Sequence, residues 1–247
     1  MSLALKFITK PLHTLYGVYF CGVFVVCSTC TAVMITVLPG QDRRKRITRN
    51  MAQLVFRLTG AWPGIEGLDN LPPESSVVVA NHASYLDGVL LTAVLPHRYQ
   101  FVIKREVADL PLMNFFLRRI GAQFVDRFDP HRGALDTRRI LQVAENGGSL
   151  AFFPEGTFRS EPGLRRFQKG AFTIAVRNNL ALVPVSIQGT RRMLPAHRLL
   201  PRPTRLKIRI YPQQLTRNGD TDVARMQEQC RRLILDQLNE PDHMHEK

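Results

Sequence analysis

The feature that most constrains the fold is an apolar run from Leu15 to Gly40, which contains no Asp, Glu, Lys or Arg. Such a run is long enough to cross the roughly 30 Å hydrocarbon core of a bilayer as a helix. Because a cleaved signal peptide has a shorter apolar run of about 7–15 residues, we expect a retained membrane element. Gly17, Gly22 and the Ser28–Thr29 pair also permit a helical hairpin bent within the run. The sequence does not choose between the spanning helix and this hairpin.

Positive charge follows the apolar run and dominates the whole chain. A basic cluster comes directly after the run, and it consists of Arg43, Arg44, Lys45, Arg46 and Arg49. Such clusters favour the cytoplasmic side of a membrane and anionic head groups, although Lys6 and Lys10 on the other flank weaken the asymmetry. Overall, 34 Lys and Arg face 20 Asp and Glu, for a net charge of +14. This balance suits a polyanionic partner such as nucleic acid, anionic lipid or a phosphorylated substrate.

The four cysteines do not form a recognisable metal site. Cys21, Cys27 and Cys30 lie inside the apolar run, and Cys230 is far away. Cys27 and Cys30 have C-x-x-C spacing, but no second pair or histidine cluster completes a zinc site. We therefore interpret them as small residues of a packed membrane helix, and we expect neither a bound metal nor a disulfide framework.

The rest of the chain alternates between short strand-like runs and helical patterns. This alternation predicts an α/β fold with a mostly parallel central sheet flanked by helices, preceded by an N-terminal hydrophobic membrane helix or helical hairpin. We divide the chain into residues 1–49, the anchor with its basic juxtamembrane segment, and residues 50–247, the globular domain. The expected strands are Ser76–Ala80, Phe101–Ile103, Gln123–Val125, Ser149–Phe153, Leu182–Ile187 and Leu206–Tyr211. The expected helices are Ser84–Val94, Leu110–Ile120, His131–Asn146, Lys169–Asn178 and Thr221–Leu238.

The expected strand Ser76–Ala80 ends in Asn81-His82, and the carboxylate of Asp87 follows five residues after the histidine. Ligands bind at the carboxyl edge of open α/β sheets, so His82 is expected at a binding edge. One interpretation is structural: Ser84 begins a helix, and Asp87 has the spacing of a capping box. The other is a His–Asp pair, in which Asp87 holds one ring nitrogen and leaves the other free as a base. Because no G-x-S-x-G motif accompanies the pair, this base would activate a hydroxyl of the substrate.

A second polar stretch, LAFFPEGTFRS from Leu150 to Ser160, also follows an expected strand. Backbone amides around Gly156, together with the fork of Arg159, suit a phosphate group. Glu155 is placed to hydrogen-bond a substrate hydroxyl or to hold the arginine. Lys169 opens the next expected helix, which is a further position suited to an anion. The structural alternative is a polar turn in which the glycine supplies unusual backbone dihedrals.

Two further stretches carry weaker signals. Lys104 follows one expected strand and Arg127 follows the next. In LVPVSIQG, Pro184 disfavours a central position for its strand unless the strand is irregular there.

The ordered motifs NHxSxxD, KxE, GAxFVDR, FPEGT and VPVSI resemble those of the glycerolipid acyltransferase family, best known for its 1-acylglycerol-3-phosphate acyltransferases. The resemblance covers about residues 50 to 215. It implies that His82 is the general base for the acceptor hydroxyl and that Asp87 orients it. It also implies direct transfer from acyl-CoA or acyl carrier protein as co-substrate, without an acyl-enzyme intermediate, a cofactor or a metal.

The resemblance assigns substrate-binding roles to a second set of residues, and it gives Pro184 a part in acyl-donor binding or site shape. The arginine stands one place later than in the common EGTRS form, because Phe158 is inserted, which makes its phosphate role less direct. The substrate-binding residues are Glu155, Gly156, Thr157, Arg159, Lys104, Arg127 and Lys169.

We therefore expect an acyltransferase of phospholipid synthesis that makes phosphatidic acid from lysophosphatidic acid. We expect it at the bacterial inner membrane, with the catalytic domain on the cytoplasmic side. A second interpretation is the same chemistry on another lyso-lipid, such as lyso-ornithine lipid or a lysophospholipid with a head group. The motif residues do not contact the part of the acceptor that distinguishes these lipids. A non-catalytic membrane-binding protein is a third, against which the intact His82 and Asp87 argue. No aromatic-basic interleaving supports a nucleic-acid partner.

Overall fold

The computed structural model describes residues 3–126, 130–216 and 222–244. Its centre is a seven-stranded sheet with the strand order β1-β8-β7-β2-β5-β3-β4. Neighbouring strands are parallel throughout, except that β7 and β8 are antiparallel. The strands are β1 (Gly64–Glu66), β2 (Ser76–Ala80), β3 (Tyr99–Lys104), β4 (Gln123–Val125), β5 (Ser149–Phe152), β7 (Ala181–Gln188) and β8 (Lys207–Ile210). A small separate sheet pairs β6 (Leu164–Arg165) with β9 (Asp242–His243).

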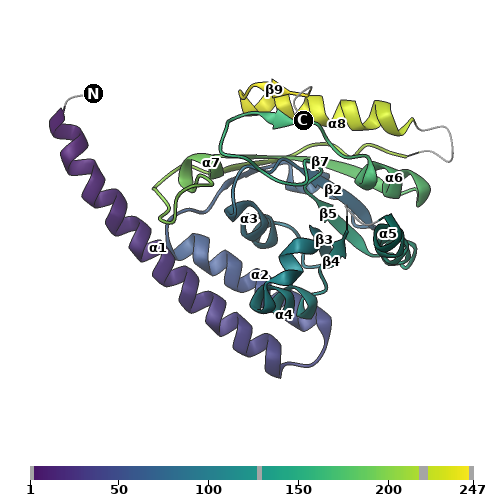
Figure 1. Ribbon diagram of the computed structural model, residues 1–247, viewed down its shortest axis with the longest axis horizontal. Coiled ribbons are helices and arrows are strands. Elements are labelled where there is room, and N and C mark those ends of the chain that lie inside the picture. Colours follow the sequence, from purple (N-terminus) through teal and green to yellow (C-terminus); the bar gives the residue numbers. More distant parts are fainter. Residues whose placement is uncertain (1–2, 127–129, 217–221, 245–247) are drawn as a thin grey trace.

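Helices cover both faces of the large sheet (Figure 1). Helices α1, α2 and α3 lie on one side, while α5, α6 and α8 lie on the other. The α-helices are α1 (Leu3–Val37), α2 (Gln41–Leu58), α3 (Leu86–Val94), α4 (Pro111–Arg119), α5 (Pro130–Glu145), α6 (Gly170–Arg177), α7 (Thr190–Met193) and α8 (Val223–Leu238). The short 3-10 helices are η1 (Leu68–Asn70) and η2 (Arg105–Asp109). The predicted α/β fold with a mostly parallel sheet and an N-terminal apolar helix is confirmed.

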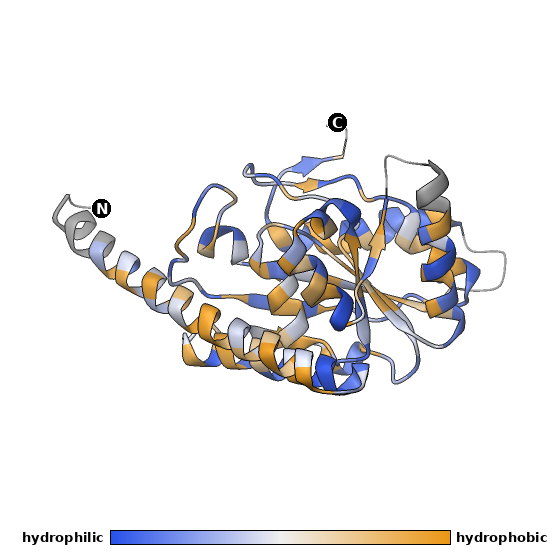
Figure 2. Ribbon diagram, turned by 60° about the horizontal axis from the view of Figure 1, so that its bottom comes forward, coloured by the Kyte–Doolittle hydropathy of each residue, from blue (hydrophilic) through white to orange (hydrophobic). Residues whose placement is uncertain are grey.

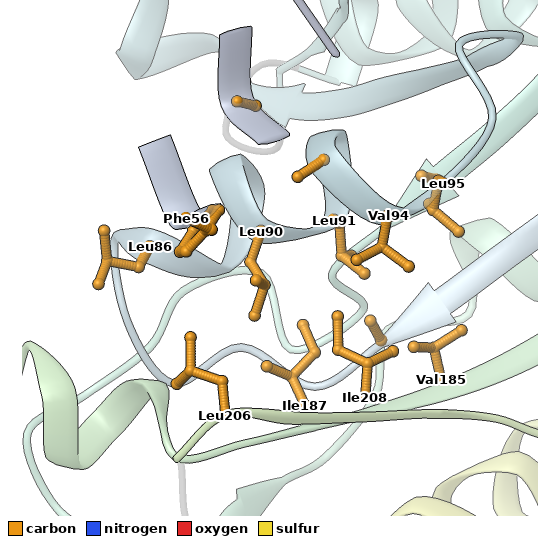
Figure 3. Close-up of a cluster of buried hydrophobic side chains, with 14 of the residues drawn as sticks. Phe56, Leu86, Leu90, Leu91, Val94, Leu95, Val185, Ile187, Leu206 and Ile208 are labelled. Carbon is orange, nitrogen blue, oxygen red and sulfur yellow. The ribbon is translucent and has the colours of Figure 1, made fainter. Parts of the chain in front are cut away.

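Strand β2 lies at the centre of the sheet and is buried along its whole length. Because successive side chains of a strand point to opposite faces, its valines enter two separate cores. Val78 packs in the core under α2 and α3, whereas Val77 and Val79 pack in the core under α5, α6 and α8. Figure 3 shows the first core, where Leu90 and Leu91 of α3 face Ile187 and Ile208 of the sheet. Because helices cover the sheet on both faces, the side chains of β2 are buried on both sides, which explains its continuous run of valines.

Helix α1 is continuous, so of the two alternatives left open by the sequence, the hairpin bent at Gly17, Gly22 or Ser28–Thr29 is wrong. The chain reverses only after α1, at Gly40, whose φ of +86° favours glycine. Gly17 has a different use: a Cβ atom there would come within 2.8 Å of the Cβ of Leu200. The glycine therefore admits a close approach of the loop that precedes β8, rather than a bend.

The segment Pro11–Val37 of α1 is long and apolar enough to cross a membrane, which is consistent with membrane association. Apolar residues follow one another along this helix, as Figure 2 shows, and several of them are exposed, including Leu15, Val18, Val25 and Val26. Both halves of α1 also contact the globular part. The Tyr19 hydroxyl donates a hydrogen bond to the Leu58 carbonyl oxygen at 3.0 Å, and Arg119 donates to the carbonyl oxygen of Ile35 at 3.3 Å. These contacts hold α1 along one flank of the α/β domain.

Helix α2 was not expected, and the boundary drawn between residues 49 and 50 falls inside it. The helix turns Thr48, Ala52, Val55 and Phe56 toward the core, at the spacing of one helical face. Arg44 and Arg49 of the basic cluster are used structurally, since their guanidinium groups donate to the carbonyl oxygens of Leu38 and Leu95 at 2.8 Å each. In the basic cluster, Arg43 and Arg46 are the exposed members.

Strand β7 is central although it contains Pro184. Regular antiparallel pairing with β8 ends at the Val185–Ile210 pair. The next pair is an isolated bridge between Leu182 and Gln214, which is shifted by one residue from the register of β8. The carbonyl oxygen of Pro184 accepts from the amide of Tyr211 at this irregularity. Pro184 has no N–H to donate, and it lies where the hydrogen bonding between β7 and β8 is interrupted. Prolines inside sheets are tolerated at such irregular positions.

Candidate active site

The loop after β2 carries His82 at the carboxyl edge of the sheet, as predicted. Asn81 fixes this loop to β7: its side-chain nitrogen donates to the carbonyl oxygen of Ile187 at 3.0 Å, and its side-chain oxygen accepts from the Ile187 amide at 2.7 Å. The Ser84 hydroxyl donates to the Leu194 carbonyl oxygen at 2.8 Å. The loop is thus tied to its surroundings on both sides of the histidine.

His82 and Asp87 form a hydrogen-bonded pair. Nδ1 of His82 lies 2.9 Å from Oδ2 of Asp87, whose side chain is completely buried. The imidazole remains 19% exposed. In the described part of the chain, no hydrogen bond engages the other ring nitrogen, Nε2. This arrangement can present Nε2 to a substrate proton while Asp87 holds the ring.

The capping-box spacing is also real, so Asp87 both contacts the His82 ring and caps the start of the helix. Oδ2 of Asp87 accepts from the amides of Ala83 at 2.6 Å and Ser84 at 2.7 Å, and the Ser84 hydroxyl accepts from the Leu86 amide at 3.2 Å. Helix α3 begins at Leu86 rather than at Ser84. The start of this helix therefore fixes the carboxylate beside the histidine ring.

Aromatic side chains surround the His82 ring, and the sequence did not predict them. The ring of Phe153 stacks on it, with centroids 4.3 Å apart and planes 19° apart. Phe158 approaches it edge-on at 4.7 Å, and Tyr85 contacts Phe158 at 4.7 Å in turn. Phe158 is the residue inserted into the EGTRS form, so the insertion was a usable signal. These contacts limit how the imidazole can rotate.

Glu155 links the second polar stretch to the histidine loop. The parallel neighbours β2 and β5 bring the two stretches to one edge. Oε1 of Glu155 accepts from the His82 amide at 2.7 Å, and Oε2 accepts from the Arg165 amide at 3.0 Å. Burial raises the pKa of Glu155 to about 7, while these amides and the nearby Arg191 oppose the shift. The carboxylate therefore holds backbone amides rather than the side chain of Arg159.

Arg191, which follows β7, organises the loop after Glu155 and was not predicted. Its guanidinium pairs with the Glu240 carboxylate at 3.1 Å and donates to the carbonyl oxygens of Arg159 and Glu161 at 2.7 and 2.9 Å. It thereby connects the second polar stretch to the C-terminal part of the described chain. The available signal was the basic pair Arg191-Arg192, which begins three residues after the end of β7.

The remaining predicted residues that the structure describes lie around this edge. Gly156 has a φ of +84°, which favours glycine, and its amide donates to the Phe153 carbonyl oxygen at 3.0 Å in a turn. Thr157, Arg159 and Lys169 are exposed, with Lys169 immediately before α6. Lys104 ends β3 and is half-buried. Arg127 lies outside the described residues.

Known proteins resemble this chain in sequence and in fold. A chloroplast 1-acyl-sn-glycerol-3-phosphate acyltransferase of Arabidopsis thaliana is 31% identical over 192 residues, which cover 73% of this chain and 53% of that protein. The chain thus spans about half the length of that relative. A lyso-ornithine lipid O-acyltransferase of Pseudomonas aeruginosa is 32% identical over 166 residues, covering 64% of this chain and 60% of that protein.

The crystal structure of the 1-acyl-sn-glycerophosphate acyltransferase PlsC from Thermotoga maritima has the same fold, with a TM-score of 0.74 at 22% identity. The superposition covers 93% of this chain and 94% of that one. The family model described as Acyltransferase matches residues 64–188, which include the His82–Asp87 pair and the Glu155 stretch. With half of its length matched by that model, the chain belongs to the Acyltransferase family.

Proposed function

We propose that the protein transfers an acyl chain from acyl-CoA or acyl carrier protein to the free hydroxyl of 1-acylglycerol-3-phosphate, which gives phosphatidic acid. The observation that carries this proposal is the His82–Asp87 pair, with its 2.9 Å hydrogen bond and a partly exposed imidazole at the sheet edge. The acceptor class is supported by the 1-acyl-sn-glycerol-3-phosphate acyltransferase among the relatives.

In the proposed mechanism, Nε2 of His82 removes the proton from the acceptor hydroxyl as that oxygen attacks the thioester carbonyl carbon. The new C–O bond forms, the C–S bond breaks, and the imidazolium returns its proton to the departing thiolate. Asp87 keeps Nδ1 protonated and the ring oriented throughout. Direct transfer needs no acyl-enzyme intermediate, which agrees with the lack of a nucleophile motif.

For the second polar stretch we propose a positioning role at Glu155, and for the predicted cations a phosphate-binding role. Glu155 already uses both oxygens on backbone amides, so it orients the His82 backbone rather than a substrate. Arg159, Lys104, Lys169 and Arg127 are the proposed partners of the acceptor phosphate or of the acyl donor. Charge-assisted hydrogen bonds to phosphate would complement positioning of the two substrates.

We further propose that the protein works at a membrane, with the basic end of α2 on the cytoplasmic side. The exposed apolar side of α1 and the exposed Arg43 and Arg46 support this orientation. In bacteria this membrane would be the inner one, where lyso-lipid acceptors reside.

An acceptor panel tests the proposed reaction. The purified full chain, in detergent–lipid mixtures, receives labelled acyl-CoA or acyl carrier protein together with lysophosphatidic acid, lyso-ornithine lipid or head-group lysophospholipids. We expect labelled phosphatidic acid, and the His82→Ala protein serves as the matched control. If product forms only from lyso-ornithine lipid, the acceptor is that lipid and not lysophosphatidic acid, as in the name of the Pseudomonas relative. No product with any acceptor, from a folded preparation, would remove the catalytic proposal altogether.

A further inference from the structure

Helix α4 carries an exposed apolar surface that belongs neither to α1 nor to the active site. The exposed fractions are 57% for Leu110, 75% for Leu112, 42% for Met113 and 41% for Phe115. We call these four residues the α4 surface, in which Leu110 directly precedes the helix. In a globular protein the outward side of a helix is normally polar. On α4 the outward side is apolar, while only Leu117 is buried against the domain.

Helix α4 lies beside the carboxyl end of α1, where the chain turns toward α2 (Figure 1). Arg119 of α4 donates to the carbonyl oxygens of Ile35 and Thr36 at 3.3 and 3.4 Å. These carbonyl groups belong to the last turn of α1, where the helix itself supplies no donor. Val33 and Val37, on the same part of α1, are 59% and 76% exposed. Scattered exposed apolar residues are ordinary, but a cluster that adjoins a membrane-competent helix indicates one contact region.

Positive charges border this region. Arg118 and Arg119 end α4. Lys45 of α2 lies next to Gly121, since a Cβ on that glycine would be 3.2 Å from Cε of the lysine. An apolar helix side bordered by Lys and Arg suits the boundary between head groups and acyl chains of an anionic bilayer.

We propose that the α4 surface inserts into the head-group and acyl boundary of an anionic bilayer, as a second membrane contact beside α1. The basic border and the continuity with α1 favour lipid over a second copy of the chain as the occupant. Because η2 and α4 follow β3, and β3 ends at the same sheet edge as β2, this contact brings the edge that carries His82 toward the membrane. Acceptor molecules could then reach the site without leaving the bilayer surface.

Tryptophan fluorescence in the full chain tests this contact. Trp62 is the single tryptophan, so a Trp62→Phe background allows one new probe at a time. Leu112→Trp places the probe on the α4 surface. Leu215→Trp is the matched control, because Leu215 is 64% exposed and lies between β8 and α8, away from α1. Each protein is mixed with vesicles of phosphatidylcholine and phosphatidylglycerol, with or without brominated acyl chains, and vesicle binding is verified by sedimentation.

We expect the Leu112→Trp emission to shift to the blue on vesicle binding and to be quenched by brominated chains, while Leu215→Trp changes little. An unquenched, water-like emission from vesicle-bound Leu112→Trp would overturn the proposal. So would a blue shift that depends on protein concentration without bromine quenching, because it would indicate a second copy on this surface. Unfolding transitions matching the background protein show that the probes are tolerated. Since no readout depends on turnover, the test is independent of the proposed reaction.

Discussion

Asp87 and Glu155 are both buried carboxylates at the carboxyl edge of neighbouring parallel strands, yet their partners differ. Oδ2 of Asp87 accepts from an imidazole and from two amides within its own loop. Among the described residues, Glu155 accepts from two backbone amides, and these belong to two separate segments, those of His82 and Arg165. One carboxylate therefore controls a side chain that faces outward, and the other holds two segments together.

We therefore expect Asp87 to affect mainly the reaction rate and Glu155 to affect mainly the stability of the fold. Removing the charge of Asp87 should change the protonation and orientation of the ring with little effect on the fold. Removing the charge of Glu155 should change the stability first, because it joins segments that are distant in sequence. Four substitutions, from the largest expected effect on activity or stability to the smallest, test this comparison.

His82→Ala should lower acyl transfer by about 10²–10⁴-fold, the usual contribution of a general base. Asp87 keeps its amide donors from Ala83 and Ser84, so the fold should persist. Initial rates with labelled acyl donor measure the loss, and the thermal unfolding transition and vesicle binding provide the control. Near-normal turnover by the purified variant would exclude His82 as the base.

Asp87→Asn should lower the rate constant by about 10²-fold while leaving the fold nearly unchanged. The new amide oxygen can take the place of Oδ2, and the amide nitrogen can take the place of Oδ1, which has no hydrogen-bond partner among the described residues. Asp87→Ala is the contrasting variant, because it leaves both loop amides without their acceptor and should also lower the melting temperature. Equal losses of stability in the two variants would mean that Asp87 is mainly a helix cap.

Glu155→Gln should cost about 1–3 kcal/mol of stability, since its amide nitrogen must face one of two N–H donors. The variant should lose stability before it loses turnover per folded molecule. Denaturant unfolding, compared with active-site titration, measures the two effects separately. A variant of normal stability but without activity would instead assign Glu155 to the chemistry.

The pH dependence of Glu155 has a definite sign. Its folded pKa of about 7 lies above the ordinary value of 4.5, so the folded state binds the proton more tightly between these values. This stabilisation is complete below about pH 4.5 and is lost as the pH rises through about 7, by at most about 3 kcal/mol. The stability gap between wild type and Glu155→Gln should therefore narrow from pH 5 to pH 8. A gap that widens would show that the folded pKa is lowered instead.

Phe158→Ala should have the smallest effect, a decrease of about 2- to 10-fold in the rate constant, in line with one aromatic contact. The stack of Phe153 on His82 remains, so the ring keeps one of its two aromatic neighbours. Phe158→Tyr preserves the edge contact and should restore most of the rate. If the tyrosine variant is as slow as the alanine variant, the contact with His82 is not the cause.

Local patterns predicted the histidine side of the site well. The strand Ser76–Ala80 has the bounds expected from its β-branched run, and the pairing of His82 with Asp87 follows from a spacing within one turn and a helix start. The buried face of α2, at Thr48, Ala52, Val55 and Phe56, also had a readable period. The basic cluster Arg43–Arg49 in the same segment favoured a head-group contact over a packed helix.

The sequence by itself determined the α/β class, the carboxyl edge that carries the polar residues, and the His–Asp pair, because strand alternation and helix capping act over a few neighbouring residues. Only the tertiary structure decided that Glu155 holds backbone amides, that Phe153 and Phe158 contact the imidazole, and that Gly17 admits a loop instead of a bend. These outcomes depend on which distant segments pack together. Packing is set by the whole chain, and no short window of sequence contains it.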